Sequence, residues 1–206
     1  PYVWKGVPRV RIPLLPPFFA MKLNLGCGSK ILKDYVNVDK FEYYNPNVVH
    51  DLENTPYPFD TDSVDEIILS HVLEHIGQNP EVFNSIIKEF YRICKNNSII
   101  DIRVPHPRHD DFISDPTHVR PITILGLQLY DKKLNETWQK NKSANTPLAL
   151  IHNVNFKIKD INYGLEKNYL EMLKKGEIDQ AQLQSYIDKY NNVIKEMRIR
   201  WIVIKD

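Results

Sequence analysis

The chain has 206 residues, 42% of them hydrophobic, and a formal net charge of +1 at pH 7. This length suits one globular domain with a sizeable core. The near-neutral charge gives no overall basic field, so we expect no obligate nucleic-acid partner. Cys27 and Cys94 are too few for a disulfide framework or a zinc quartet, which favours a reducing, cytoplasmic compartment. No apolar run is long enough to span a bilayer.

Residues 1–20 differ from the rest of the chain because prolines crowd them, among basic residues. Pro13, Pro16 and Pro17 interrupt the only apolar stretch there, which disfavours a signal peptide. We interpret 1–20 as an extended arm, or as sequence upstream of a natural start at Met21. Residues 21–206 are then a single domain.

From residue 21 onward, apolar runs alternate with a helical pattern, which is typical of a parallel sheet covered by helices. The expected strands are 22–25, 35–38, 47–50, 64–70 and 98–104. Between the last two, apolar residues at a 3.6-residue period predict a helix over 80–96.

The second half of the chain has a different rhythm. A polar loop over 106–120 precedes a helical run over about 122–140, and residues 155–163 and 196–205 alternate like strands. We expect these two strands to pair antiparallel at the edge of the sheet. A charged helical insertion at about 165–195 separates them, as a lid or a self-association surface, so a homo-oligomer stays open. Its expected apolar helix face consists of Leu183, Tyr186, Ile187, Tyr190 and Ile194.

The strand at 22–25 leads directly into a turn with two glycines, Gly26 and Gly28. A strand, a Gly-x-Gly turn and a helix together bring bare backbone against a nucleotide-like cofactor. Ile31 stands where a dinucleotide-binding loop has its third glycine, which disfavours a bound pyrophosphate. The Gly-Lys-Ser/Thr ending of a P-loop is also absent. The short segment before Asp39 leaves room for a first helix of only a turn or two.

Later residues extend this signal. Asp39 ends the second apolar run, and three further segments follow the same order and spacing as a known family: Leu23–Ser29, Asp51–Leu52 and Ser70–Ile76. Together they resemble the class I S-adenosylmethionine-dependent methyltransferases, most of all a small bacterial or phage type (methyltransferase-11-like) with a His-x-Leu-Glu-His segment. The resemblance covers residues 21 to about 104 well and the tail in outline.

The resemblance implies an α/β, Rossmann-like fold. Its sheet has seven mostly parallel strands with an antiparallel last strand, and helices on both faces. It also implies S-adenosylmethionine as the cofactor. Asn24 departs from the family, because many relatives carry an acidic residue at that position.

Each predicted cofactor contact has a chemical reason. Glycines let the loop backbone approach the cofactor, and the two oxygens of Asp39 can accept both ribose hydroxyls. Asp51 suits the adenine amino group, although a helix N-cap is the alternative, and His71 lies near the sulfonium. The predicted cofactor-binding residues are Asn24, Gly26, Cys27, Gly28, Asp39, Asp51, Leu52, Ser70 and His71.

The loop at 106–120 is the expected catalytic segment because it is rich in titratable groups and follows a strand end. His118 is the leading candidate base, with Asp115 or Asp111 orienting it, and His106 is the second candidate. A polar loop held by its own turns is the alternative. A metal site is a further alternative, but no His-Glu-x-x-His or close His-x-His pair appears, so no metal is predicted.

These observations predict a methyltransferase that uses S-adenosylmethionine on a small-molecule or glycan-linked acceptor. A non-catalytic protein of the same fold, which binds the cofactor as a regulatory or assembly subunit, is the alternative. NAD-dependent chemistry is disfavoured by the missing third glycine.

Overall fold

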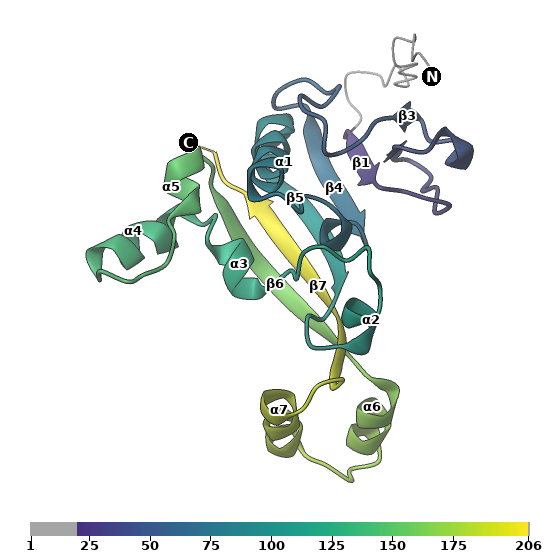
Figure 1. The fold of residues 1–206 in the computed structure, drawn as a ribbon, viewed down its shortest axis with the longest axis vertical. Coiled ribbons are helices and arrows are strands. Elements are labelled where there is room, and N and C mark those ends of the chain that lie inside the picture. The colour runs from purple at the N-terminus through teal and green to yellow at the C-terminus, as the bar shows by residue number, and fades with distance from the viewer. Residues whose placement is uncertain (1–19, 206) are drawn as a thin grey trace.

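A computed structural model describes residues 20–205, so the predicted arm at 1–20 lies, apart from Ala20, outside the described residues. The described chain forms a seven-stranded sheet in the order β3-β2-β1-β4-β5-β7-β6 (Figure 1). Its strands are β1 (Lys22–Leu25), β2 (Val36–Asp39), β3 (Val48–Val49), β4 (Val64–Ser70), β5 (Cys94–Pro105), β6 (Phe156–Leu165) and β7 (Ile194–Val203).

The sheet has the predicted strand directions. Strands β3, β2, β1, β4 and β5 are parallel, whereas β7 is antiparallel to both β5 and β6. The seven-stranded, mostly parallel sheet with an antiparallel last strand is therefore confirmed. Because β2, β1 and β4 are parallel neighbours, their carboxyl ends lie along one edge of the sheet.

Helices and short 3-10 turns connect the strands. They are η1 (Glu42–Tyr44), η2 (Leu73–His75), α1 (Pro80–Ile93), α2 (Asp110–Ile113), α3 (Ile124–Gln128), α4 (Lys132–Lys140), α5 (Leu148–His152), α6 (Lys167–Lys174) and α7 (Gln180–Lys189). The predicted helix at 80–96 ends at Ile93, immediately before β5, and the predicted helical run at 122–140 is divided into α3 and α4.

Helix α1 shows why the sequence signal was reliable there. The Asn79 side chain accepts a hydrogen bond from the Glu81 N–H, and Pro80 occupies the first helical position, where its missing N–H costs nothing. Phe83, Ile86 and Phe90 face the sheet and are buried. These residues join the inward side chains of β4, β5 and β7 in one core.

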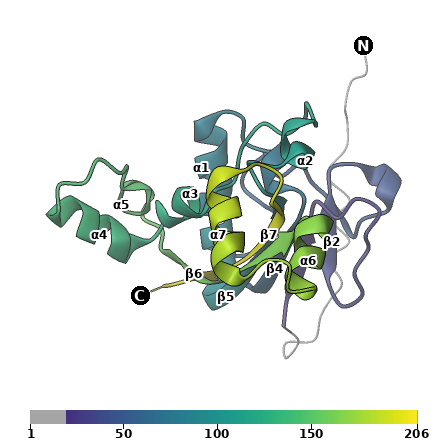
Figure 2. The ribbon, with the colours of Figure 1, turned by 90° about the horizontal axis from the view of Figure 1, so that it is seen from below.

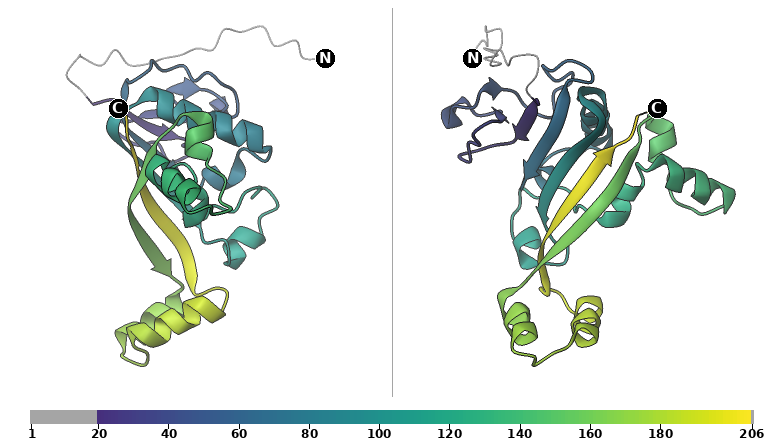
Figure 3. Two further views of the ribbon diagram at one scale, coloured as in Figure 1. Left: turned by 90° about the vertical axis from the view of Figure 1, so that its left-hand side faces the viewer. Right: turned by 180° about the vertical axis from the view of Figure 1, so that it is seen from behind.

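The helices cover one face of the sheet, which differs from the expectation of helices on both faces. Along β4, β5 and β7, buried residues alternate with half-buried or exposed ones, the pattern of a sheet packed on a single side. Figure 3 shows α1, α3 and α5 on one side of the strands, and no helix of the described residues against the other. The uncovered face is charged, with ion pairs such as Arg198 with Asp101 at 2.6 Å.

The reason lies in the two links that would otherwise form helices. Residues 26–35 contain two glycines in left-handed backbone conformation, and Asp34 has φ +66°. The expected short helix after β1 is therefore absent, and this link is a series of turns. Residues 50–63 contain Pro56 and Pro58, which suit turns rather than a helix interior.

The expected insertion is a two-helix lobe beyond the end of the β6–β7 pair (Figures 1 and 2). Ile178, Leu183 and Val193 form its small core, with Tyr186 and Ile187 packed against them. The predicted apolar helix face is thus only partly helical. Tyr190 caps α7 and is exposed, and Ile194 belongs to β7, because α7 ends at Lys189.

Cys27 and Cys94 are both buried and free. Within residues 20–205 no helix has the length and apolar character that crossing a membrane requires.

Candidate active site

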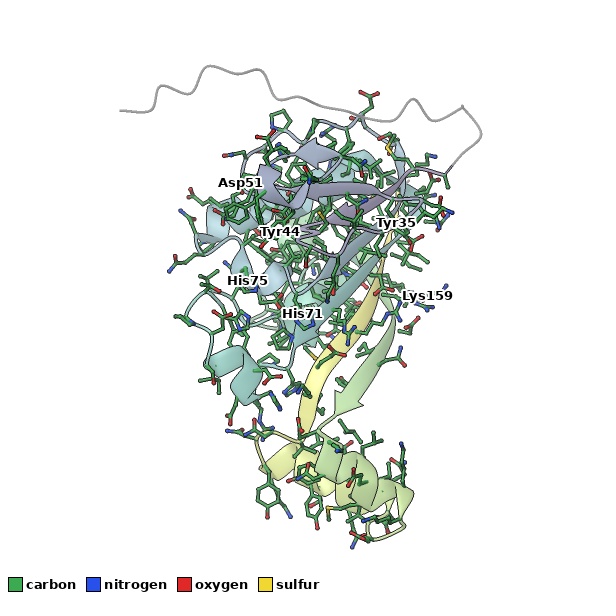
Figure 4. The ribbon with its side chains drawn as sticks, turned by 90° about the vertical axis from the view of Figure 1, so that its right-hand side faces the viewer. Tyr35, Tyr44, Asp51, His71, His75 and Lys159 are labelled. Atoms are coloured by element: carbon green, nitrogen blue, oxygen red, sulfur yellow. The ribbon has the colours of Figure 1, made fainter. Side chains whose placement is uncertain are left out.

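A cavity of about 560 Å³ opens at the carboxyl ends of β1, β2 and β4. We call it the Asp39 cavity. Asp39 contributes from β2, Asp51 and Leu52 from the link after β3, and His71 and His75 from the segment after β4. Figure 4 shows Asp51, Tyr44, His75 and His71 following one another along this side of the molecule. Five of the nine predicted cofactor-binding residues therefore line one cavity, namely Gly26, Asp39, Asp51, Leu52 and His71.

The glycine turn is attached to β2 at two points. The Cys27 N–H donates to the Val38 carbonyl at 3.0 Å, and the Gly28 N–H donates to Asp39 Oδ2 at 2.8 Å. Gly26 has φ +64°, and a Cβ atom there would lie 2.6 Å from Val72 Cγ2. Only glycine fits this position, because both the backbone conformation and the neighbouring side chain exclude a larger residue.

Gly26→Ala should destabilise the protein more than Gly28→Ala. Gly28 also has a positive φ, +49°, but nothing lies within 4 Å of its Cβ position. Both variants carry a left-handed alanine, which costs about 1–2 kcal/mol, and only Gly26→Ala adds the clash with Val72. Urea unfolding of the two variants measures this difference. Equal losses would show that Val72 moves aside without cost.

Asp39 is buried at the end of β2 and already serves the loop backbone. Its Oδ2 accepts from the Gly28 N–H, and its Oδ1 accepts from the Phe41 N–H at 2.9 Å. A carboxylate oxygen has two lone pairs, so each oxygen can accept a further hydrogen bond from a hydroxyl group in the cavity. The carboxylate is thus held in place, and its two oxygens can still accept hydrogen bonds from the two hydroxyls of a diol.

The link after β3 forms the opposite wall. Leu52 is buried, and Asp51 Oδ1 accepts from the Glu53 N–H at 3.1 Å, whereas no donor of residues 20–205 forms a hydrogen bond to its Oδ2. His50 packs edge-on against Tyr57 with ring centroids 5.2 Å apart, and its Nε2 is buried without a hydrogen-bond partner in the part of the chain that the structure describes. Burial lowers the pKa of His50, so a neutral imidazole lines this wall at pH 7.

Asn24, Cys27 and Ser70 lie apart from the Asp39 cavity. They line a second cavity of about 570 Å³ on the uncovered sheet face, beside Asp101 and Arg103. The Asn24 amide donates to the Lys30 carbonyl and to Asn37 Oδ1, both at 2.8 Å. It therefore holds the link between β1 and β2. Burial raises the pKa of the Cys27 thiol to about 11, so it is uncharged at pH 7.

The predicted catalytic residues are divided between several places. His106 lines a separate cavity of about 420 Å³, and burial together with nearby Arg108 lowers its pKa. The half-buried Asp115 accepts from the Thr117 hydroxyl and N–H, and these hydrogen bonds lower its pKa. His118 stacks on Phe112 and is nearly covered, with Nε2 3.8 Å from Asp115 Oδ2. None of the three lines the Asp39 cavity.

Thr117, between two of these residues, does line the Asp39 cavity, together with His75. His75 is the last residue of the 3-10 turn η2, and His71 precedes this turn with φ +56°. Nothing in the sequence around Thr117 indicated that it would line this cavity. Tyr44 and Phe41 also line the cavity, and their apolar–aromatic character after the strand end was the signal that could have identified them.

Comparison with known proteins bears on the fold of the chain. Residues 27–100 match the methyltransferase domain family. This segment is somewhat over a third of the chain, and it contains every residue that lines the Asp39 cavity except Gly26 and Thr117. No curated protein matches the sequence significantly. Among solved structures, a SAM-dependent methyltransferase from Archaeoglobus fulgidus superimposes with a TM-score of 0.56 at 18% identity, covering 90% of this chain and 88% of that one.

The chain has the class I methyltransferase fold. A SAM-dependent methyltransferase from Methanosarcina mazei has the same fold, with a TM-score of 0.53 at 12% identity, covering 90% of this chain and 93% of the other. So does the [4+2]-cyclase SpnF, with a TM-score of 0.51 at 13% identity, covering 91% and 76%. The methyltransferase fold therefore supports more than one reaction, and the reaction must be argued from the site.

Proposed function

We propose that the chain binds S-adenosylmethionine in the Asp39 cavity and transfers its methyl group to a small-molecule or glycan-linked acceptor. The observation that carries this proposal is the pairing of Asp39 with the Gly26–Gly28 turn. A buried carboxylate, held by the Gly28 and Phe41 N–H groups, stands at a strand end beside a glycine turn whose Gly28 Cβ position is open.

In this proposal Asp39 accepts the ribose hydroxyls, and Asp51 accepts from the adenine amino group against the apolar side of Leu52. Gly26 lines the cavity beside the cofactor, and His71 lies toward the sulfonium end. Asn24, Cys27 and Gly28 then act indirectly, by supporting the turn, whereas Ser70 lines the second cavity. Asn24 supports it through Lys30, and Gly28 supports it through Asp39.

The acceptor enters at the end of the cavity marked by His75 and Thr117. Methyl transfer from a sulfonium needs the two reactants in line more than it needs a proton on the leaving group. His118 packs against His75 with ring centroids 4.5 Å apart, so we assign it a role through His75 rather than direct contact. Asp115 orients Thr117, and His106 takes no part. We place the reaction in the cytoplasm, in line with the two free cysteines.

Calorimetry with S-adenosylhomocysteine, the product of the donor, tests the proposal. We expect saturable binding with one molecule per chain. A thermal-shift comparison should show stabilisation by S-adenosylhomocysteine and none by NAD. Absence of binding would overturn the proposal, and binding without turnover on any acceptor would favour the non-catalytic alternative.

A further inference from the structure

We propose that Glu74, His75 and His118 form a binding site for a divalent first-row transition-metal ion at the edge of the Asp39 cavity. One ligand atom of each residue lies within 4.8 Å of the others. Glu74 and His75 come from η2, and His118 comes from the loop after α2. The Val119 and Arg120 N–H groups donate to the Glu74 carbonyl at 2.9 and 3.1 Å, which holds the loop against η2.

Glu74 is the first argument for a cation. Its side chain is fully buried, and neither carboxylate oxygen has a hydrogen-bond partner among the described residues. Such a group is costly to bury in its charged form unless a cation or several donors compensate it. A metal ion bound at this carboxylate supplies that compensation.

The two imidazoles are the second argument, because each is oriented through Nδ1. His118 Nδ1 lies 2.8 Å from the Phe112 carbonyl, which can only accept, so Nδ1 carries the proton. His75 Nδ1 lies 3.3 Å from the Thr117 carbonyl and 3.0 Å from its hydroxyl. That hydroxyl donates to Asp115 at 2.6 Å, so it accepts from His75. Both rings therefore keep the Nε2 lone pair free to bind a metal.

An imidazole that donates one N–H to a carbonyl while its other nitrogen binds a metal is the usual arrangement around protein metal sites. Two imidazoles and one carboxylate suit Zn²⁺, Mn²⁺, Fe²⁺ or Co²⁺, whereas Mg²⁺ and Ca²⁺ prefer oxygen ligands. Three protein ligands also leave coordination positions open. His75 and Thr117 line the cavity, so an acceptor oxygen could occupy one of these open coordination positions. This role of the metal rests on the proposed function.

Ion pairs provide the competing explanation. His71 Nδ1 lies 3.4 Å from Glu74 Oε1, and a protonated His71 could compensate the carboxylate without a metal. His71 is also 3.4 Å from Glu196, and Asp115 lies 3.8 Å from His118 Nε2. The two explanations predict opposite effects of Glu74→Gln on the metal-free protein, which makes them separable.

The experiment titrates chelator-treated protein with Co²⁺ alone, without S-adenosylmethionine, and follows visible absorption and calorimetry. We expect one Co²⁺ per chain, and an affinity reduced at least about 100-fold in Glu74→Gln and His118→Gln, since loss of even a supporting residue costs about 10–100-fold. His152→Gln, which removes a histidine of α5, is the matched control and should bind as the wild type does.

Unfolding midpoints add a readout that does not depend on activity. Co²⁺ should raise the midpoint of the wild type and leave that of Glu74→Gln unchanged, and metal-free Glu74→Gln should be as stable as the wild type or more so. No Co²⁺ binding by the wild type overturns the proposal, as does unchanged affinity in both variants. If the wild type binds no metal and the metal-free Glu74→Gln variant is less stable than the wild type, Glu74 belongs to the ion pair with His71.

If the variants fold poorly, paramagnetically shifted imidazole N–H signals of the Co²⁺-loaded wild type decide the question. Two such signals support His75 and His118 as ligands, and none overturns the assignment. S-Adenosylhomocysteine binding is measured separately on the metal-free wild type, so failure of the metal site and failure of the proposed function remain distinguishable.

Discussion

Asp39→Ala is expected to lower the affinity for S-adenosylhomocysteine by at least about 100-fold, because it removes two hydrogen bonds to a charged group worth about 1.5–3 kcal/mol each. Asp39 is buried, and both of its oxygens face groups that position it toward the cavity. The variant also frees the Gly28 and Phe41 N–H groups, so the glycine turn should become less ordered. Calorimetry of the wild type and the variant under the same conditions measures the loss.

The control is Glu42→Gln, which changes an exposed acidic residue in the neighbouring turn η1. It should bind with unchanged affinity. Urea unfolding of Asp39→Ala separates loss of the ligand contact from loss of the fold. A stable Asp39→Ala protein with wild-type affinity would contradict the assignment of Asp39 to the ribose.

Trp201→Ala should reduce the free energy of unfolding by about 3–5 kcal/mol, the cost of removing a large aromatic side chain from a core. Trp201 is fully buried in β7, the strand that joins β6 to the rest of the sheet. It stacks on Phe156 with centroids 4.1 Å apart and meets Tyr130 edge-on at 5.9 Å. The alanine variant therefore leaves a cavity between β6, β7 and the segment after α3.

Trp201→Phe is the matched control for this prediction. It keeps an aromatic ring against Phe156 and removes Nε1, which is buried without a hydrogen-bond partner in the described structure. We expect it to lose clearly less stability than Trp201→Ala in urea unfolding, since an unpaired buried N–H is itself unfavourable. Equal losses in the two variants would show that Nε1 has a partner in solution.

The elements that the sequence predicted well are those whose local signals agree with their surroundings. In strands β4 and β7 buried residues alternate with half-buried or exposed ones, and α1 combines a cap, a proline at its start and an apolar stripe. The link after β1 was predicted less well. A helix was expected there by analogy, whereas Gly26, Gly28 and Asp34 all adopt left-handed conformations that a helix cannot contain.

The candidate site divides in the same way. Asp39, Asp51 and His71 each follow a strand, and parallel strands bring such positions to one edge, so their meeting could be predicted from order alone. Asn24 and Ser70 also stand near strand ends, but their side chains face the uncovered side of the sheet. Which face a strand residue occupies follows from the pleat, and which face is left uncovered depends on where the helices pack.

By itself the sequence determined the strands, the glycine turn and the acidic residues that follow the strands, because these depend on local backbone preferences and on hydrophobic periodicity. Only the tertiary structure decided that His118 joins Glu74 and His75. Its loop is attached to η2 by hydrogen bonds to the Glu74 carbonyl, a contact between distant segments with no periodic signature. Tertiary packing also left the Glu74 carboxylate buried without a hydrogen-bond partner among the described residues, and burial of this kind depends on the neighbours that surround a residue in space.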